Sequence, residues 1–421
     1  MTKLAILFPG QGSQYVGMGK DLCEKFNVAK KVFEEANDAL GIDIQKLCFE
    51  GSLDELTKTE NSQPAILTMS CAAFRVYMQE FGLIPSYMAG HSLGEYSALV
   101  CAGSIEFADA VKIVRQRGRF MQEAVAVGIG AMAAISGVDK SVIEKECLEL
   151  TNEDQIVVVS NYNSPEQTVV SGHKQAIETL GKKFTEMGAR VMPLKVSAPF
   201  HSPLMQPAAD NLRSELLKYT YKELTYPVIS NVSALPYTNV ESIVDNLFMQ
   251  IVQPVRWVES MDYLQEQGVT MAIEMGPQTV LRNLMKKNAP SIETFSYDRE
   301  EDVAALQKQL VKSGHAPENQ KGNIMELIIK CMAVAVCTKN RNWDNNEYQK
   351  GVVEPYRRIK EMQAKLEEKG KEPLPEQAEE ALNMLKSVFV TKRTPLEEQV
   401  ERFNHILGTT GTKDLFLHKY I

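Results

Sequence analysis

A serine that could act as a nucleophile lies in the pattern Gly-x-Ser-x-Gly, formed by Gly90, His91, Ser92, Leu93 and Gly94. A short apolar run precedes it and a helix-like run follows, which is the strand–turn–helix context of a nucleophile elbow. Such a tight turn needs small residues beside the serine, and the two glycines supply them. Ser92 would then lie at a helix N-terminus, where backbone N–H groups can stabilise an oxyanion. The alternative is a Gly-rich helix start with a capping serine.

A serine nucleophile needs a general base, and two histidines compete for that role. His201 follows Phe200 in a loop between two prolines, whereas His91 is adjacent to Ser92 in the chain. Neighbouring side chains diverge at a sharp turn, so we favour His201 as the base. Candidate acids such as Asp210 and Asp245 have no special sequence context. We therefore predict a Ser–His dyad whose imidazole is oriented by a backbone carbonyl. A structural or solvent-exposed loop histidine is the alternative.

A glycine-rich segment, Gly10–Gly19, follows the first predicted strand, Leu4–Phe8. A dinucleotide-binding fingerprint would need glycine where Tyr15 stands, and a P-loop would need serine or threonine where Asp21 stands. Both phosphate-binding interpretations are therefore excluded. In elbow enzymes a loop in this position donates the second N–H of the oxyanion hole. A simple turn-forming glycine cluster is the other interpretation.

Composition bounds the class of protein. The 421 residues are 44% apolar and 24% charged with a net charge of −8, which is typical of a globular protein with more than one domain. No basic block is present, so we expect no nucleic acid as a partner. Seven scattered cysteines indicate free thiols in a reducing compartment and no metal site. No apolar run approaches the length of a membrane span, so we expect no membrane partner and a cytoplasmic location.

The order of predicted elements indicates an α/β fold with two additions. Residues 128–197 show a βαββαβ pattern, which predicts a ferredoxin-like small subdomain with a hairpin turn at 161–167. Apolar stripes predict helices near 323–338, 345–369, 376–391 and 395–407. The predicted division is a large α/β-hydrolase-like body (1–127 and 198–306), the small subdomain (128–197), a polar linker (307–322) and a helical extension (323–421).

Several motifs together resemble one family, the malonyl-CoA:acyl-carrier-protein transacylases and the related acyltransferase domains of polyketide synthases. They span nearly all of residues 1–300 in the expected order. The motifs are FPGQGSQYVGMG at 8–19, QPAI at 63–66, GHSLGEYSALVCAG at 90–103, RQRGRFMQ at 115–122, NSPEQTVVSG at 163–172, APFHS at 198–202, SNV at 230–232 and QPVRW at 253–257.

The resemblance implies a role for each matching residue. It makes Ser92 the nucleophile that carries the acyl group and His201 the general base. It assigns the oxyanion hole to the backbone N–H groups of Gln11 and Leu93. The remaining assignments are Arg117 as the partner of the malonyl carboxylate, the backbone carbonyl of Gln250 as the group that orients His201, and Phe200 as a residue typical of malonyl-selective members.

The implied substrate agrees with the chemistry of these residue types. A guanidinium binds a carboxylate bidentately with fixed geometry, which suits a malonyl group. Transfer between two thioesters through a serine ester is nearly balanced, so the enzyme must mainly exclude water. Phe200 beside Arg117 would crowd an α-methyl group, and one methyl is worth only ~1–3 kcal/mol. We therefore expect imperfect malonyl selectivity, and no cofactor apart from the substrate, malonyl-CoA.

The C-terminal segment departs from the family pattern, since single-domain members resemble this chain only to about Asp298. The extended form resembles discrete transacylases that serve modular polyketide or lipopeptide synthases. The implied partners are malonyl-CoA, a phosphopantetheinylated acyl carrier protein and a polyketide or nonribosomal peptide synthase. The extension either packs against the body or docks such a partner.

Two other functions remain open on the sequence. One is an acyl hydrolase that clears carrier proteins, although hydrolases of similar sequence tend to lose the arginine that Arg117 matches. The other is a non-catalytic scaffold that recruits a carrier through its helical tail, against which the intact elbow argues.

Overall fold

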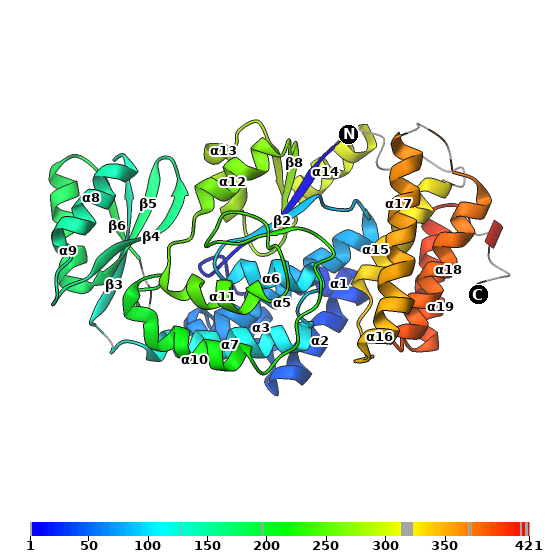
Figure 1. The fold of residues 1–421 in the computed structure, drawn as a ribbon, viewed down its shortest axis with the longest axis horizontal. Helices are drawn as coiled ribbons and strands as arrows, with labels where there is room; N and C mark the ends of the chain where they lie inside the picture. Colours follow the sequence, from blue (N-terminus) through cyan, green and yellow to red (C-terminus); the bar gives the residue numbers. More distant parts are fainter. Residues whose placement is uncertain are drawn as a thin grey trace. The chain divides into compact units, whose positions relative to one another are not determined.

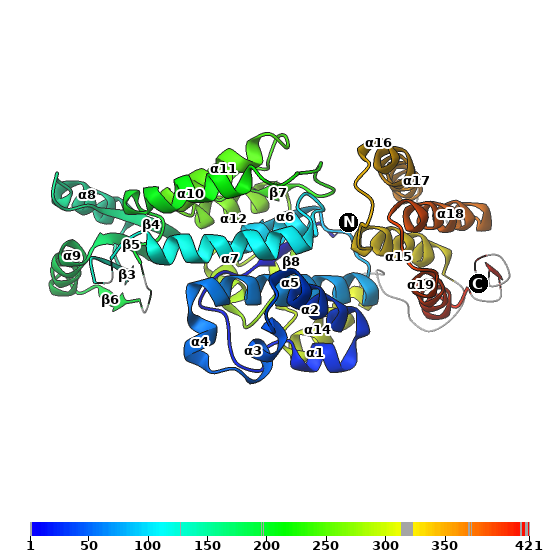
Figure 2. The ribbon, with the colours of Figure 1, turned by 90° about the horizontal axis from the view of Figure 1, so that it is seen from below.

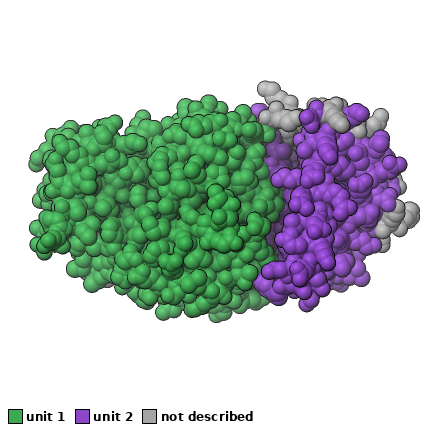
Figure 3. All heavy atoms as spheres, viewed as in Figure 1, with its two compact units in different colours: residues 1–74, 85–303 green, residues 75–84, 304–421 purple. Residues whose placement is uncertain are grey.

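The computed structural model divides the chain into two compact units. It describes residues 2–126, 128–194, 196, 198–312, 323–368, 371, 373–412, 415–416 and 420. Unit 1 comprises Met1–Phe74 and Pro85–Val303, and unit 2 comprises Arg75–Ile84 and Ala304–Ile421 (Figure 3). The second unit thus includes a short segment that lies between the two stretches of unit 1 in the sequence.

A five-stranded parallel sheet forms the centre of unit 1. Its first strand, β1, occupies the predicted range and is buried along its whole length, as parallel strands covered on both faces are. Phe8 at the end of β1 is in register with Gly90 at the end of β2. The loops that follow these two strands therefore leave the sheet at the same edge. The strand order is β7 (Val228–Ile229), β2 (Tyr87–Gly90), β1 (Leu4–Phe8), β8 (Met271–Glu274) and β9 (Glu293–Ser296).

Helices cover both faces of this sheet (Figures 1 and 2). On one face α12 and α13 bury side chains such as Trp257 and Met285 against Ala5 and Leu7 of β1. On the other face Phe74 of α5 meets the ring of Phe8 edge-on. The helices of this unit are α1 (Lys20–Lys25), α2 (Asn27–Leu40), α3 (Ile44–Glu50), α4 (Leu53–Thr57), α5 (Thr59–Glu80, which continues into unit 2), α6 (Leu93–Cys101), α7 (Phe107–Glu123), the 3-10 turn η1 (Pro203–Met205), α10 (Gln206–Leu216), α11 (Ser242–Val252), α12 (Trp257–Glu266) and α13 (Val280–Asn288).

A second, antiparallel sheet with two helices confirms the ferredoxin-like prediction. Its strand order, β4-β5-β3-β6, is the order that a βαββαβ unit of this type adopts. An apolar cluster that includes Ile143 of α8 and Phe184 of α9 packs on the sheet. The elements are β3 (Gly130–Ser136), α8 (Lys140–Leu150), β4 (Val157–Ser164), β5 (Gln167–His173), α9 (Lys174–Glu186) and β6 (Arg190–Pro193).

The predicted hairpin turn at 161–167 is too long. Strand β4 continues to Ser164 and β5 begins at Gln167, so Asn161 and Asn163 are strand residues. Two irregularities in the register of β4 explain the error, because they break the alternation that marks a strand in sequence.

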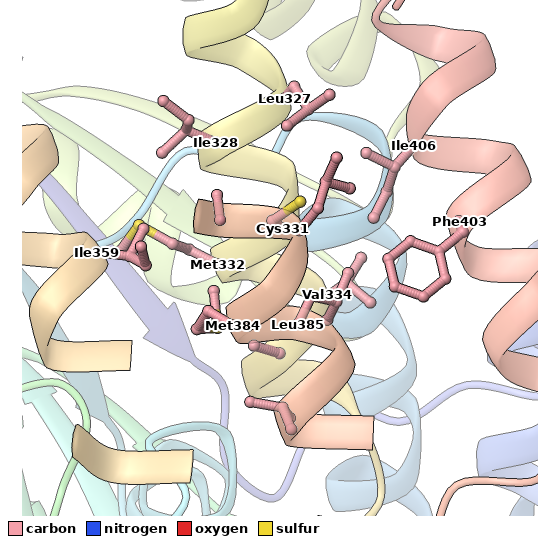
Figure 4. Close-up of a cluster of buried hydrophobic side chains, with 14 of the residues drawn as sticks. Leu327, Ile328, Cys331, Met332, Val334, Ile359, Met384, Leu385, Phe403 and Ile406 are labelled. Atoms are coloured by element: carbon pink, nitrogen blue, oxygen red, sulfur yellow. The ribbon is translucent and has the colours of Figure 1, made fainter. Parts of the chain in front are cut away.

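Unit 2 is a helical bundle with its own apolar core. The stripe predicted on α18 is buried, and it packs against residues of α15, α17 and α19 (Figure 4). Ile84, from the segment between α5 and β2, packs on the same core. The helices are α15 (Ile324–Cys337), α16 (Asn345–Tyr348), a π-helical turn η2 (Gln349–Val353), α17 (Glu354–Glu368), α18 (Pro375–Thr391) and α19 (Leu396–Thr409).

The predicted linker at 307–322 begins too early. Helix α14 (Glu300–Lys312) runs through its first residues, with acidic side chains in the first turn and Leu306 and Leu310 buried. Residues 313–322 of the predicted linker lie outside the described residues.

Candidate active site

Ser92 lies at a strained turn between β2 and α6. Its backbone has φ 52° and ψ −105°. Residues other than glycine rarely adopt this conformation, and those that do are often found at functional sites. A Cβ on Gly90 would lie 1.9 Å from the carbonyl carbon of Gly94, and one on Gly94 would lie 2.0 Å from the carbonyl oxygen of Phe8. The two glycines therefore allow strand, turn and helix to pack closely enough to present the serine.

His201 contacts the hydroxyl of Ser92, although the two residues lie far apart in the chain. Ser92 Oγ is 2.8 Å from His201 Nε2, and His201 Nδ1 is 2.7 Å from the backbone oxygen of Gln250 in α11. Because a carbonyl can only accept, Nδ1 carries the proton and Nε2 is left as an acceptor for the serine hydroxyl. Within the described part of the chain no carboxylate contacts this imidazole; Asp210 bonds Gln206, and Asp245 pairs with Arg213.

The imidazole of His201 is held in its neutral form. The side chain is 4% exposed. Burial first, and then the positive charge of Arg117, lower the pKa of His201 to about 3. A neutral imidazole at physiological pH can accept a proton from the serine.

Arg117, from α7, brings a buried cation to the same hydroxyl. It is 1% exposed, and its Nη2 donates to Ser92 Oγ at 3.2 Å. Its other acceptors are amide oxygens, Gln63 Oε1 through Nη1 and Gln250 Oε1 through Nη2, each at 2.9 Å. The guanidinium also lies 5.3 Å from the centre of the Tyr96 ring, and its Nε has no partner among the described residues. Burial lowers the pKa of Arg117. A buried cation whose hydrogen-bond partners are neutral is suited to bind an anionic ligand.

Gln11 and Leu93 follow the ends of β1 and β2, at the edge of the sheet where Ser92 lies. The N–H of His91 donates to the carbonyl of Phe8 at 3.0 Å, which ties the elbow to the end of β1. Neither the backbone N–H of Leu93, the first residue of α6, nor that of Gln11 donates to an acceptor among the described residues. Both amides can therefore donate to a ligand.

Phe200 forms part of the tight turn that carries His201. Its N–H donates to the carbonyl of Ala198 at 3.0 Å, and its side chain is buried. His201 itself has φ 56°, so the turn is strained like the elbow.

The environment of His91 differs from that of His201. Its Nε2 bonds Asn163 Oδ1 at 2.8 Å, and its ring lies 5.5 Å from that of Trp257. The His91 Nε2 is therefore engaged by the small subdomain and not by Ser92.

Three polar residues that sequence reasoning gave no role hold the site together. Asn231 Oδ1 accepts from the N–H of Ser92 at 2.7 Å, Gln63 holds Arg117, and the carboxylate of Glu95 accepts from Gln250 Nε2 at 2.6 Å. All three lie inside quoted motifs, SNV for Asn231, QPAI for Gln63 and GHSLGEYSALVCAG for Glu95, which was the available signal. No group of three or more metal-ligating side chains occurs in the described ranges, and no helix there is long and apolar enough to cross a membrane.

The fold and the site place the chain in a known class. A sequence profile described as the acyl transferase domain matches residues 6–322. The chain therefore belongs to the acyl transferase family.

Two curated relatives within that family share one name. The chain is 42% identical over 400 residues to a malonyl CoA-acyl carrier protein transacylase of Bacillus subtilis, covering 95% of this chain and 99% of the relative. It is 48% identical over 306 residues to that of Escherichia coli K12, covering 72% of this chain and 99% of the relative. The match to the first relative covers so much of this chain that it includes most of the helical segment.

Solved structures agree. A transacylase of the same name from Coxiella burnetii has a TM-score of 0.71 and 40% identity, over 73% of this chain and 98% of its own. A malonyl-transacylase solved in complex with a type II polyketide synthase acyl-carrier protein has a TM-score of 0.71 and 42% identity, over 73% of this chain and 100% of its own.

Proposed function

We propose that this protein transfers a malonyl group from malonyl-CoA to the phosphopantetheine thiol of an acyl carrier protein through an ester on Ser92. The observation that carries the proposal is that a neutral imidazole and a guanidinium with no carboxylate partner both lie within hydrogen-bond distance of the Ser92 hydroxyl. The names of the similar proteins support the same substrate pair.

The first half-reaction acylates the serine. His201 Nε2 takes the hydroxyl proton while Ser92 Oγ attacks the thioester carbonyl. The N–H groups of Leu93 and Gln11 stabilise the oxyanion. When the tetrahedral intermediate collapses, the C–S bond breaks and the coenzyme A sulfur takes the proton from His201.

The second half-reaction reverses these steps with a different thiol. The pantetheine thiol of the carrier gives its proton to His201, and its sulfur attacks the Ser92 ester. The C–O bond then breaks and the serine oxygen recovers the proton. The carbonyl of Gln250 orients the imidazole in both halves and favours the transient imidazolium, in the place where a triad has a carboxylate.

Arg117 gives the site its acyl preference. A malonyl carboxylate can form two parallel hydrogen bonds with the guanidinium. Because Arg117 also donates to Ser92 Oγ, a bound carboxylate would place the thioester carbonyl beside the nucleophile. Phe200, in the turn beside His201, would crowd an α-methyl substituent. We expect replacement of Phe200 by alanine to reduce the preference for malonyl over methylmalonyl about tenfold.

The wider context completes the proposal. No cofactor takes part, since malonyl-CoA is the substrate. We place the enzyme in the cytoplasm, in the service of a polyketide or nonribosomal peptide synthase. Residues 1–127 and 198–306 carry the chemistry and 128–197 form the small subdomain. Residues 323–421 form the helical extension.

The test is transfer itself. With malonyl-CoA and a phosphopantetheinylated carrier protein, the carrier should gain one malonyl group at a rate proportional to enzyme. Rapid release of free acid from acetyl-carrier protein without malonyl loading would favour a hydrolase instead. Failure of the protein to load any acyl group onto the carrier would refute the proposal that it is an enzyme.

A further inference from the structure

We propose that Glu95 is the positioning residue of this site: its carboxylate fixes the side-chain amide of Gln250 and, through Asn231, the elbow, so that Arg117 faces the acyl carboxylate. The inference rests on the proposed function, because it concerns how the same site selects malonyl.

Glu95 lies on α6 one turn beyond Ser92, and it is 0% exposed. Its Oε2 accepts from Gln250 Nε2 at 2.6 Å and from the backbone N–H of Asn231 at 3.2 Å. Its Oε1 accepts from the hydroxyl of Tyr237 at 2.5 Å. Each oxygen of this buried carboxylate therefore has a donor inside the protein.

The first consequence concerns the orientation of the Gln250 amide. A glutamine amide has a donor end and an acceptor end that look alike in shape. Glu95 and the backbone oxygen of Ser92, at 3.0 Å, hold the NH₂ end, so Oε1 faces Arg117. The reverse orientation would place an NH₂ group against the guanidinium. Glu95 thereby keeps a hydrogen-bond acceptor, Gln250 Oε1, directed at the Arg117 guanidinium.

The second consequence concerns the elbow. Asn231 donates its backbone N–H to Glu95, and its side chain accepts from the N–H of Ser92 and donates to the carbonyl of Gly90 at 2.6 Å. Both sides of the strained serine are thus tied to a residue that Glu95 anchors. One carboxylate therefore supports the nucleophile and the anion site together.

The third consequence is electrostatic. Glu95 lies close enough to Arg117 to influence it, but the Gln250 amide stands between them, so the two do not form a contact ion pair. Elsewhere in unit 1 Arg282 pairs directly with Asp302 at 2.9 Å, which occupies that guanidinium. Because the Gln250 amide separates the two groups, Glu95 balances the charge of Arg117 only in part, and the guanidinium can still bind a substrate carboxylate.

The charge state of Glu95 supports the same role. Burial raises the pKa of Glu95 to about 7, against the opposing effects of Tyr237, Gln250, Asn231 and Arg117. The charged or titratable groups around it are Arg117 of α7, Tyr237 after β7 and Tyr96 of α6 itself. A guanidinium keeps its charge in proteins, and burial raises the pKa of both tyrosines. Of these groups, Glu95 is therefore the one whose pKa lies near 7. Protonation of Glu95 would place an O–H donor where the carboxylate now accepts three hydrogen bonds.

The experiment compares Glu95→Gln and Glu95→Ala with Glu274→Gln as a matched control. Glu274 is also a 0% exposed carboxylate with a raised pKa, about 8, but it accepts from the first amides of α13 and does not contact Gln250. Steady-state loading of carrier protein would be measured with malonyl-CoA and with acetyl-CoA from pH 5 to 9, alongside denaturant unfolding.

We expect Glu95→Gln to raise KM for malonyl-CoA and lower its kcat/KM about tenfold, with less effect on acetyl-CoA, and Glu95→Ala to lose about a hundredfold. The fall in wild-type kcat/KM below about pH 7 should flatten in Glu95→Gln. The control should keep the wild-type ratio of malonyl to acetyl and the wild-type pH profile.

An unchanged ratio and pH profile in Glu95→Gln would overturn the inference. The inference would also be overturned if Glu95→Gln lowered kcat/KM equally for malonyl-CoA and acetyl-CoA, in proportion to its loss of stability, as in the control. A wild-type protein that fails to load malonyl would refute the proposed function instead, and the two failures are thereby distinguished.

Discussion

The two units use buried charge differently. In unit 1 Arg117 is surrounded by amide and hydroxyl oxygens. In unit 2 the buried Lys330 pairs with Glu326 at 3.2 Å. A carboxylate partner balances the charge of Lys330 within the bundle, whereas a guanidinium held only by neutral groups can still bind an anion. The comparison separates a buried cation that is available to a ligand from one that is balanced inside the protein.

The largest expected effect that sharpens this comparison is at His201. We expect His201→Ala to lower kcat/KM for malonyl transfer roughly 10³-fold, because the serine loses its proton acceptor. Stopped-flow measurement of coenzyme A release would check this. A loss below tenfold would show that another group acts as the base.

The next largest effect is expected at Arg117, the buried cation with no carboxylate partner. Arg117→Ala should lower kcat/KM for malonyl-CoA roughly 10²-fold while affecting acetyl-CoA much less, because only malonyl presents a carboxylate. Competition between the two thioesters would measure the ratio. Equal losses for both would assign Arg117 a structural role, as for Lys330 of unit 2.

The core of unit 2 should respond in stability and not in chemistry. Leu385→Ala deletes a fully buried side chain of α18 and should lower the free energy of unfolding by about 2–5 kcal/mol. Acylation of Ser92 by malonyl-CoA should persist in the folded variant, because the site residues all lie in unit 1. The exposed Lys386→Ala serves as a control. Loss of acylation in folded Leu385→Ala would contradict the division of roles.

The smallest effect is a pH dependence of stability. The pKa of His201 is about 3 in the folded protein, below its ordinary value of 6.5. The unfolded chain therefore binds a proton that the folded chain rejects as pH falls below about 6.5, and stability is lost toward pH 3. Unfolding of His201→Gln, followed by circular dichroism, should show a weaker acid dependence. Identical curves for both proteins would contradict a buried, neutral imidazole.

Local patterns predicted the parts of the fold that depend on local sequence. The stripe on α18 and the βαββαβ order can be read from periodicity, and the glycines around Ser92 from the steric needs of a turn. Periodicity could not show that Ile84 joins the core of unit 2, since that depends on tertiary packing. It also misplaced the linker, because α14 continues on two buried leucines.

The site was predictable to the extent that motifs carry it. The sequence predicted a Ser92–His201 dyad with a carbonyl in place of an acid, and the family resemblance supplied Arg117 and Gln250. The parts played by Glu95 and Asn231 could not be read from the sequence. Their functions arise only where the ends of β2, β7 and α11 meet, and no local pattern distinguishes a buried carboxylate that positions an amide from one that caps a helix, such as Glu274.

The most direct test of the central claim is the intact mass of the protein after brief exposure to malonyl-CoA, followed by peptide mapping. The account predicts a single malonyl adduct on the peptide that contains Ser92, absent in Ser92→Ala. No adduct on the wild-type protein, or an adduct that survives in Ser92→Ala, would contradict it.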